Sequence, residues 1–404
     1  MTKLTSRVSR VSMTGPLAPF AEDYRRELAE RGYTPRTAEH QLRQVARFSA
    51  WLESNEVVIA QLSQRHVEDF LAFQRDVGRY RATWSRPGLM CLINVLDAQG
   101  VLGAAPPATA LTPTEVMLEA FERYLLEERG LAAGTVRGYV DHAGRFLDGL
   151  GEAGLTGLGP CAVTDALLGQ SRSVSVSATK CFRSGLRAFL RFGFIEGLID
   201  TDLTGAALAV TGRRRSSLPR GINSADARAL LASCDRRTAL GRRDYALLIT
   251  LLRLGLRRSE VARLQLDDVD WRSGEVVIRG KAARADRLPL PAEVGEAIAG
   301  YLRRGRPRSE RRELFLQARA PFAPIASGTV ASSVRRACRR AGIEEVGPHR
   351  LRHTVACELI AAHVPLVEIA QVLRHKSLQS TALYARVDVE TLRLLAAPWP
   401  GGVR

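Results

Sequence analysis

Two basic residues in the C-terminal half of the chain have settings that would suit phosphate chemistry. Arg257 lies in GLRRSE (255–260), after a glycine and before a serine that we expect to cap a helix. Lys281 lies at the tip of a predicted β-hairpin, and only four of the 59 basic residues are lysines. An amine can give up a proton at this place, whereas a guanidinium cannot. Considered alone, each residue also fits a solvated loop or turn.

The segment PHRLRHT (348–354) places further polar side chains at the start of a predicted helix. His349 and Arg352 are three positions apart and share one helix face, so both can point at one phosphate. His353 follows His349 by four positions, which is the spacing of a zinc-binding HExxH pair. We discount a metal site because the central glutamate is absent and two arginines interleave. His353 is therefore expected to pack in the core or to support the phosphate-binding side chains.

The last two candidates are His375, at a helix end, and Tyr384, nine positions later. Considered alone, a tyrosine on a helix rich in alanine and leucine is a core residue. Together with the other four, these residues complete a set that phosphoryl transfer requires. Attack of a phenolate on a phosphodiester builds negative charge that arginine and imidazole donors stabilise, and a lysine can protonate the departing alkoxide. The covalent link conserves the bond energy, so we expect no nucleotide cofactor. Because arginines can supply the electrostatic stabilisation, we also expect no metal.

In this order the motifs resemble those of the tyrosine recombinase (phage integrase) family. The resemblance covers roughly residues 218–390 and consists of GLRxxE, GK on the hairpin, HxLRHT and LxHxS followed by TxxY. It implies that four residues bind and activate the scissile phosphate, namely Arg257, His349, Arg352 and His375. Lys281 would be the general acid. Tyr384 would be the nucleophile that forms a 3′-phosphotyrosyl link and frees a 5′-hydroxyl.

The resemblance also makes Glu260 a structural partner near Arg257, and one position departs from the family pattern. Arg374 stands just before the motif histidine, where family members commonly have glycine. Integrases associated with transposable elements often carry a bulky residue there. We therefore expect the fold and the catalysis to be retained, with a different local turn.

The family's activity implies a site-specific DNA recombinase and integrase that exchanges strands of duplex DNA through a Holliday junction. The partners would be double-stranded target sites and either a homo-tetramer or a hetero-tetramer with sibling recombinases. A mobile element, a plasmid or a chromosome-dimer system would supply the sites. Two other functions stay open, a type IB topoisomerase-like relaxase and a catalytically silent accessory subunit that bridges DNA.

The elements that must position these residues are helices and one small sheet. Ser224 can cap a helix over 225–233, and residues 243–254 have a strongly helical pattern. Residues 274–280 and 287–290 read as a β-hairpin, and helices dominate after it. The predicted fold class is therefore mainly α with a small antiparallel β-sheet, arranged with further helical domains as a C-shaped DNA clamp.

The first half of the chain contains a repeat with an offset of 98 positions, seen in LAERG at 28–32 and LEERG at 126–130. Each copy reads as an amphipathic helix that ends at glycine, an N-capping threonine (Thr37 or Thr135) and a second amphipathic helix. Chance similarity is the alternative. We predict two tandem helical domains, an additional DNA-binding or assembly domain at 15–105 and a SAM-like, core-binding domain at 112–203. A basic linker at 204–217 and the catalytic domain at 218–398 follow.

The charge of the chain favours an anionic partner, because its formal net charge is +17. Arginines in the linker and on one later helix are expected to contact the DNA backbone, although a solvated tether and a solvated helix face are the alternatives. They are Arg213, Arg214 and Arg215, and Arg335, Arg336, Arg339 and Arg340. No apolar run suits a membrane span or a secretory signal, and the six scattered cysteines support neither disulfides nor a zinc site. We therefore expect a cytoplasmic protein with no membrane partner.

Overall fold

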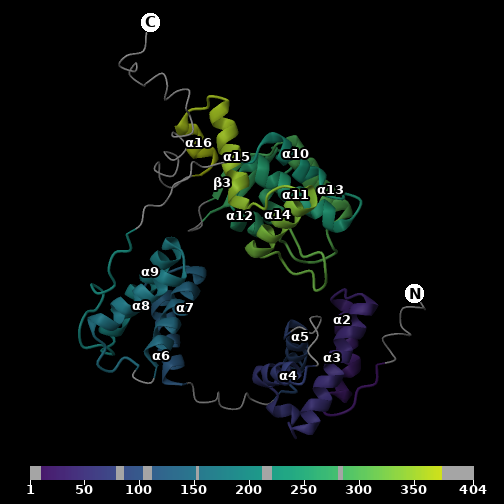
Figure 1. The fold of residues 1–404 in the computed structure, drawn as a ribbon. Helices are drawn as coiled ribbons and strands as arrows, with labels where there is room; N and C mark the ends of the chain where they lie inside the picture. Colours follow the sequence, from purple (N-terminus) through teal and green to yellow (C-terminus); the bar gives the residue numbers. More distant parts are fainter. Residues whose placement is uncertain are drawn as a thin grey trace. The chain divides into compact units, whose positions relative to one another are not determined.

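The computed structural model describes residues 11–78, 86–102, 112–151, 154–211, 221–280 and 285–374 (Figure 1). The chain divides into two compact units, one of Gly103–Ser216 and one of Met1–Leu102 with Ser217–Arg404. Buried apolar side chains form separate clusters, which lie within residues 11–102, 117–210 and 222–373. The domain boundaries at 15–105, 112–203, 204–217 and 218–398 stay predictions.

The first helices of the chain surround a core of leucine and aromatic side chains. They are η1 (Ala18–Phe20), α2 (Ala21–Glu30), α3 (Pro35–Ser54), η2 (Ile59–Gln61), α4 (Gln64–Asp76) and α5 (Arg86–Ala98). Phe48 of α3 packs on Phe70 of α4 with ring centroids 5.1 Å apart, and both rings are fully buried. This aromatic contact joins the two helices at the centre of the cluster.

A second group of helices repeats this order, with α6 (Pro113–Glu127), α7 (Ala133–Leu150), α8 (Pro160–Ser173) and α9 (Val176–Ile195). The helices α3 and α7 begin 98 positions apart, which agrees with the offset of the sequence repeat. The predicted threonine caps are wrong, because Thr37 and Thr135 lie inside the first helical turns. Thr34 caps α3 by accepting a hydrogen bond from the Thr37 amide, and Ala132 precedes α7 without a side-chain cap.

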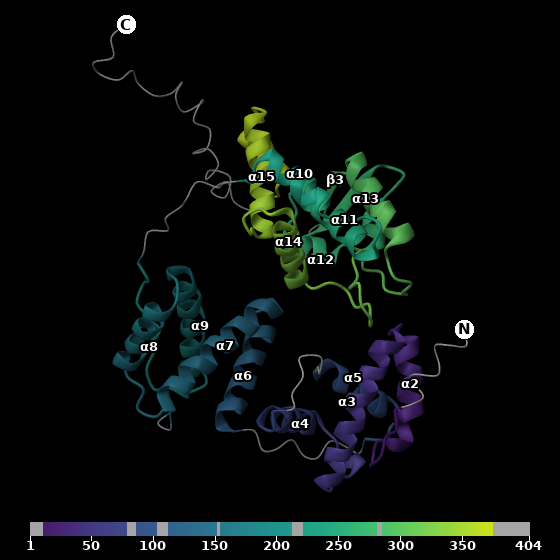
Figure 2. The ribbon, with the colours of Figure 1, turned by 45° about the vertical axis from the view of Figure 1, so that its right-hand side comes forward.

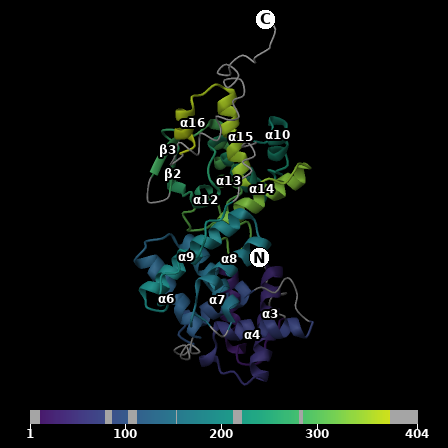
Figure 3. The same cartoon turned by 60° about the vertical axis from the view of Figure 1, so that its left-hand side comes forward.

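The remaining elements lie in the C-terminal region, which also contains the sheet. The helices before the sheet are α10 (Ser224–Ala232), α11 (Ala239–Leu254), α12 (Arg258–Arg263) and η4 (Leu266–Asp268). The antiparallel sheet has the order β1 (Val269–Asp270), β2 (Glu275–Arg279), β3 (Ala285–Pro289), and Figure 3 shows β2 beside β3. The helices after it are α13 (Ala292–Arg304), α14 (Ser327–Ala341), α15 (Pro348–Ala361) and α16 (Leu366–Val372).

These elements confirm the predicted fold class, mainly α with a small antiparallel sheet. The predicted hairpin is present as β2 and β3, and Val276 and Ile278 of β2 are buried with the expected period of two. One cap was predicted wrongly, because Asn223 caps α10 by accepting a 2.7 Å hydrogen bond from the Asp226 amide, and Ser224 is the first helical residue. None of the helices in the described ranges is long and apolar enough to cross a membrane.

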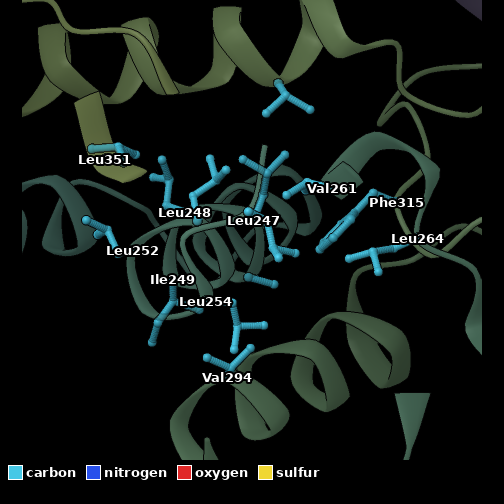
Figure 4. Packing of buried hydrophobic residues seen from close by; sticks show 14 of the residues in the cluster. Leu247, Leu248, Ile249, Leu252, Leu254, Val261, Leu264, Val294, Phe315 and Leu351 are labelled. Carbon is cyan, nitrogen blue, oxygen red and sulfur yellow. The ribbon is translucent and has the colours of Figure 1, made fainter. Parts of the chain in front are cut away.

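Helix α11 is the central helix of the C-terminal region. The helices α10, α13, α14 and α15 pack against α11 (Figure 2), which explains why apolar residues occur on several sides of this helix. Leu247, Leu248 and Leu251 are fully buried, and Figure 4 shows part of this core. Burying one leucine contributes about 1.5–3 kcal/mol. This packing fixes the end of α11, where the candidate site begins.

Candidate active site

Arg257 lies between two helices, with its side chain held by a carboxylate. Helix α11 ends at Gly255, and Arg257 itself is the N-cap residue of α12, so the expectation of a serine cap is wrong. Glu260 accepts one hydrogen bond from the backbone amide of Arg257 at 2.8 Å and another from Nη1 of the Arg257 side chain at 2.7 Å. The Arg257 side chain remains 38% exposed. Glu260 therefore fixes an arginine that solvent, or a ligand, can reach.

Among the predicted site residues that the structure describes, Arg352 is the most deeply buried, with only 2% of its surface exposed. It lies on α15, and its Nη1 donates a 2.6 Å hydrogen bond to the Gly255 carbonyl. Its Nη2 donates to the carbonyl of Leu373, at the end of α16. Both of these acceptors are neutral carbonyl groups, so neither of them cancels the charge of the guanidinium.

The turn after α16 contacts both arginines. The carbonyl of Leu373 accepts from Arg352, and the carbonyl of Arg374 accepts a 3.1 Å hydrogen bond from Nη2 of Arg257. The guanidinium of Arg374 donates to Oε2 of Glu260 at 2.8 Å. Arg374 has a φ of 52°, in the left-handed region that costs an L-residue about 1–2 kcal/mol and glycine nothing. The family's glycine would suit this turn, and here an arginine adopts it.

Glu260 is a buried carboxylate between two guanidinium groups. Burial favours its protonated form, but the hydrogen bond from the Arg257 amide and the charges of Arg374 and Arg257 together hold its pKa below the usual value. Its side chain is 3% exposed. Glu260 is thus ionised at neutral pH and acts as a fixed anchor, as the resemblance implies.

His349 lies in the first turn of α15, near both predicted catalytic arginines. Burial lowers its pKa, and the positive charges of Arg352, Arg257 and Arg258 lower it further. Its ring centroid is 5.2 Å from that of His353. Burial, followed by the effects of His349 and nearby arginines, lowers the pKa of His353 to about 4. Both imidazoles are therefore neutral at pH 7, and a neutral ring can still donate one hydrogen bond.

The structure thus brings together three of the six predicted catalytic residues, Arg257, His349 and Arg352. The other three, Lys281, His375 and Tyr384, lie outside the described residues, as do Arg213, Arg214 and Arg215 of the linker. Within the described ranges, no group of three or more His, Cys, Asp or Glu side chains is placed to hold a metal ion.

The four arginines of α14 divide into two pairs. Arg336 and Arg340 turn back toward α11, where their nitrogens lie 3.9 and 4.0 Å from Oδ2 of Asp244. Arg339 forms a surface ion pair, and Arg335 is exposed. The buried carboxylate of Asp244 therefore neutralises part of the positive charge of the predicted basic face. The contact of this face with DNA stays a prediction.

The family model described as "Phage integrase family" matches residues 221–391, a range that contains all six predicted catalytic residues. A putative integrase/recombinase of Sinorhizobium fredii is 37% identical to this chain, over 96% of this chain and 95% of the relative. The chain belongs to the phage integrase family. Tyrosine recombinase XerD of Mycobacterium tuberculosis is 31% identical, over 69% of this chain and 95% of that protein.

Solved recombinase structures share the fold of this family member. The XerH site-specific recombinase bound to its palindromic difH substrate, in a post-cleavage complex, matches with a TM-score of 0.55 and 19% identity, over 70% of this chain and 84% of that one. A lambda integrase tetramer bound to a Holliday junction matches with a TM-score of 0.52 and 17% identity, over 78% and 88% of the two chains. At these identities the likeness concerns the fold.

Sequence reasoning missed two charged partners in this family member. It singled out Arg374 as a departure from the motif but did not pair its side chain with Glu260. It also passed over Asp244, which is 1% exposed and accepts a 2.7 Å hydrogen bond from Arg243. The available signal was a pair of adjacent opposite charges inside an otherwise apolar helix, because such charges are rarely buried unless they are paired.

Proposed function

We propose that this chain is a site-specific DNA recombinase that cleaves and rejoins duplex DNA through a 3′-phosphotyrosyl intermediate. The observation that carries the proposal is the convergence of Arg257 and Arg352 on one turn, with His349 near both arginines. The motif order of the chain also supplies Lys281, His375 and Tyr384. Two positive guanidinium groups and neutral imidazoles form an environment suited to a phosphodiester that gains charge during reaction.

In the cleavage step, the phenolate oxygen of Tyr384 bonds to phosphorus and the bond from phosphorus to the 5′-oxygen breaks. Lys281 protonates the departing 5′-oxygen. Arg257, Arg352, His349 and His375 stabilise the charge on the non-bridging oxygens. A 5′-hydroxyl of the partner strand then attacks the phosphotyrosyl link and releases the tyrosine, so that rejoining draws on the conserved bond energy.

The partner in this proposal is duplex DNA, with four protomers exchanging strands through a Holliday junction. The net charge of +17 supports backbone binding, and the matching XerH and lambda integrase structures contain DNA, the latter as a tetramer on a junction. Homo-tetramers and hetero-tetramers both fit these observations. The basic residues at 213–215 and on α14 would contact phosphates.

Covalent capture on DNA tests the chemistry. The protein is incubated with nicked duplexes randomised over their central base pairs, and adducts that survive denaturing electrophoresis are sequenced. The wild type should form adducts on related sequences, and Tyr384→Phe should form none. Tyr245→Phe, a matched change on α11, should react like the wild type. A wild type that forms no adduct would contradict the proposal and favour a silent accessory subunit.

Product analysis separates recombination from relaxation. Two duplexes that carry the captured sequence, labelled differently, are incubated with the protein, and a supercoiled plasmid that carries one copy is treated in parallel. A recombinase should produce duplexes that combine both labels. Relaxed plasmid without joined duplexes would instead identify a type IB topoisomerase-like relaxase.

A further inference from the structure

Arg374 reaches Arg257 by two routes. Its carbonyl accepts a 3.1 Å hydrogen bond from Nη2 of Arg257, and its guanidinium donates to Oε2 of Glu260 at 2.8 Å. Glu260 in turn accepts a 2.7 Å hydrogen bond from Nη1 of Arg257 through Oε1. One carboxylate therefore bridges two guanidinium groups, and one residue of the turn contacts both members of the Arg257–Glu260 pair.

The burial of these groups indicates which of the two arginines faces the substrate. The side chains of Arg374 and Glu260 are 7% and 3% exposed, whereas that of Arg257 is 38% exposed. Arg374 and Glu260 thus form the inner pair, and Arg257 is the outer group. Since only the outer group is open to a ligand, Arg374 would affect a phosphate through the inner carboxylate.

The net charge of this cluster depends on Arg374. Arg257 and Glu260 alone would form a neutral pair, and the nearby carboxylate would cancel much of the attraction that Arg257 exerts on a phosphate. With Arg374 included, the three groups carry one net positive charge. A glycine at position 374 would satisfy the left-handed backbone but would leave the carboxylate with Arg257 alone.

We propose that Arg374 is a positioning residue, which holds Glu260 so that Arg257 is oriented and keeps a net positive charge toward the scissile phosphate. This inference rests on the proposed recombinase function. Besides Glu260, the guanidinium contacts the Val372 carbonyl at 3.3 Å, a contact within its own turn. Among the residues that the structure describes, the side chain therefore has one long-range partner, and that partner is the carboxylate of the site.

The test is the single-turnover rate of adduct formation on the captured DNA sequence. Arg374→Gly keeps the carbonyl and suits the positive φ, so the turn should be preserved. Its rate should fall by at least about tenfold, while DNA affinity should stay within about twofold. Arg374→Lys, which keeps the charge, should recover part of the rate. Arg237→Gln, which removes an exposed arginine just before α11, should react like the wild type.

The pH profile separates positioning from a loss of structure. Loss of the Arg374 charge allows Glu260 to bind a proton at higher pH, so the acid limb of the Arg374→Gly profile should move to higher pH. In the described part of the chain, the other charged or titratable groups near this cluster are Arg257 and Arg258 on the α12 side and His349, Arg352 and His353 on α15. In a Glu260→Gln background the Arg374 substitution should no longer move the limb.

Each outcome bears on the inference. A wild-type rate, or an unmoved acid limb, in Arg374→Gly would overturn it, and so would a shift that persists without Glu260. If the wild type itself forms no adduct, the proposed function and this inference fall together. If the wild type reacts and Arg374→Gly reacts equally well, only this inference fails.

Discussion

The guanidinium of Arg352 donates a 2.6 Å hydrogen bond to the carbonyl of Gly255, which lies 97 positions earlier in the chain. Gly255 ends α11 with a φ of 56°. A Cβ atom at this position would lie 2.9 Å from Cδ2 of Leu373 and would also touch Val355. The end of one helix, the face of a second and the last turn of a third therefore meet at Gly255, with no room for a side chain.

Gly255→Ala is expected to lower the free energy of unfolding more than the backbone strain alone can explain. The positive φ costs alanine about 1–2 kcal/mol, and crowding by Leu373 adds about 1–3 kcal/mol. Gly274→Ala is the matched control, because Gly274 has a φ of 67° and open space around it, so it should cost only the strain. Urea unfolding of both variants measures the difference, and equal losses would contradict the crowded geometry.

Stability should fall as the pH falls, because the fold lowers the pKa values of two histidines on α15. The pKa of His353 is lowered to about 4 and that of His349 is also lowered. The unfolded chain takes up these protons near pH 6.5, but the folded chain does so only at lower pH. The stabilisation is therefore complete above pH 6.5 and is lost as the pH falls toward 4. His353→Gln should remove part of this dependence.

The expected difference is about 1 kcal/mol between pH 7 and pH 4.5, once the partial exposure of the ring is allowed for. Urea unfolding at the two pH values, for wild type and His353→Gln, provides the comparison. His40→Gln, at an exposed position on α3, should keep the wild-type pH dependence. The same loss of stability in wild type and His353→Gln would argue against a neutral, half-buried His353.

Arg335 is expected to contribute more to DNA binding than its neighbour Arg339. Arg335 is exposed on α14, whereas Arg339 lies 3.1 Å from Glu345. Removing one phosphate contact lowers the slope of log affinity against log salt by about 1. Arg335→Gln should show this change in fluorescence anisotropy with a random-sequence duplex, and Arg339→Gln a smaller one. Arg237→Gln is the control, because Arg237 is exposed and lies outside α14. An unchanged slope for Arg335→Gln would show that α14 is not part of the DNA interface.

Local patterns predicted much of the C-terminal fold, because they depend on neighbouring residues. The alternation of buried residues in β2 and the apolar length of α11 were both visible in the sequence. Helix starts were less certain, since several capping residues stand together near each one. Asn223 and Thr34 took the cap positions in place of Ser224 and Thr37 because the helices began earlier than the apolar pattern indicated.

The site was predicted from motif order, but its internal bonds were not. Arg257, His349 and Arg352 were singled out by residue type, spacing and resemblance. The bond from Arg374 to Glu260 spans 114 positions, and no local pattern reports such a contact. The roles of Lys281, His375 and Tyr384 stay predictions.

The hydrogen bonds to residues 373 and 374 also set a condition on when the site can exist. Arg257 and Arg352 obtain these partners only from a turn that is among the last described parts of the chain. A polypeptide still emerging from the ribosome, or one ended early by a nonsense codon, holds the arginines without the carbonyls that orient them. The arrangement that depends on these hydrogen bonds can therefore form only after residues 373 and 374 have left the ribosome.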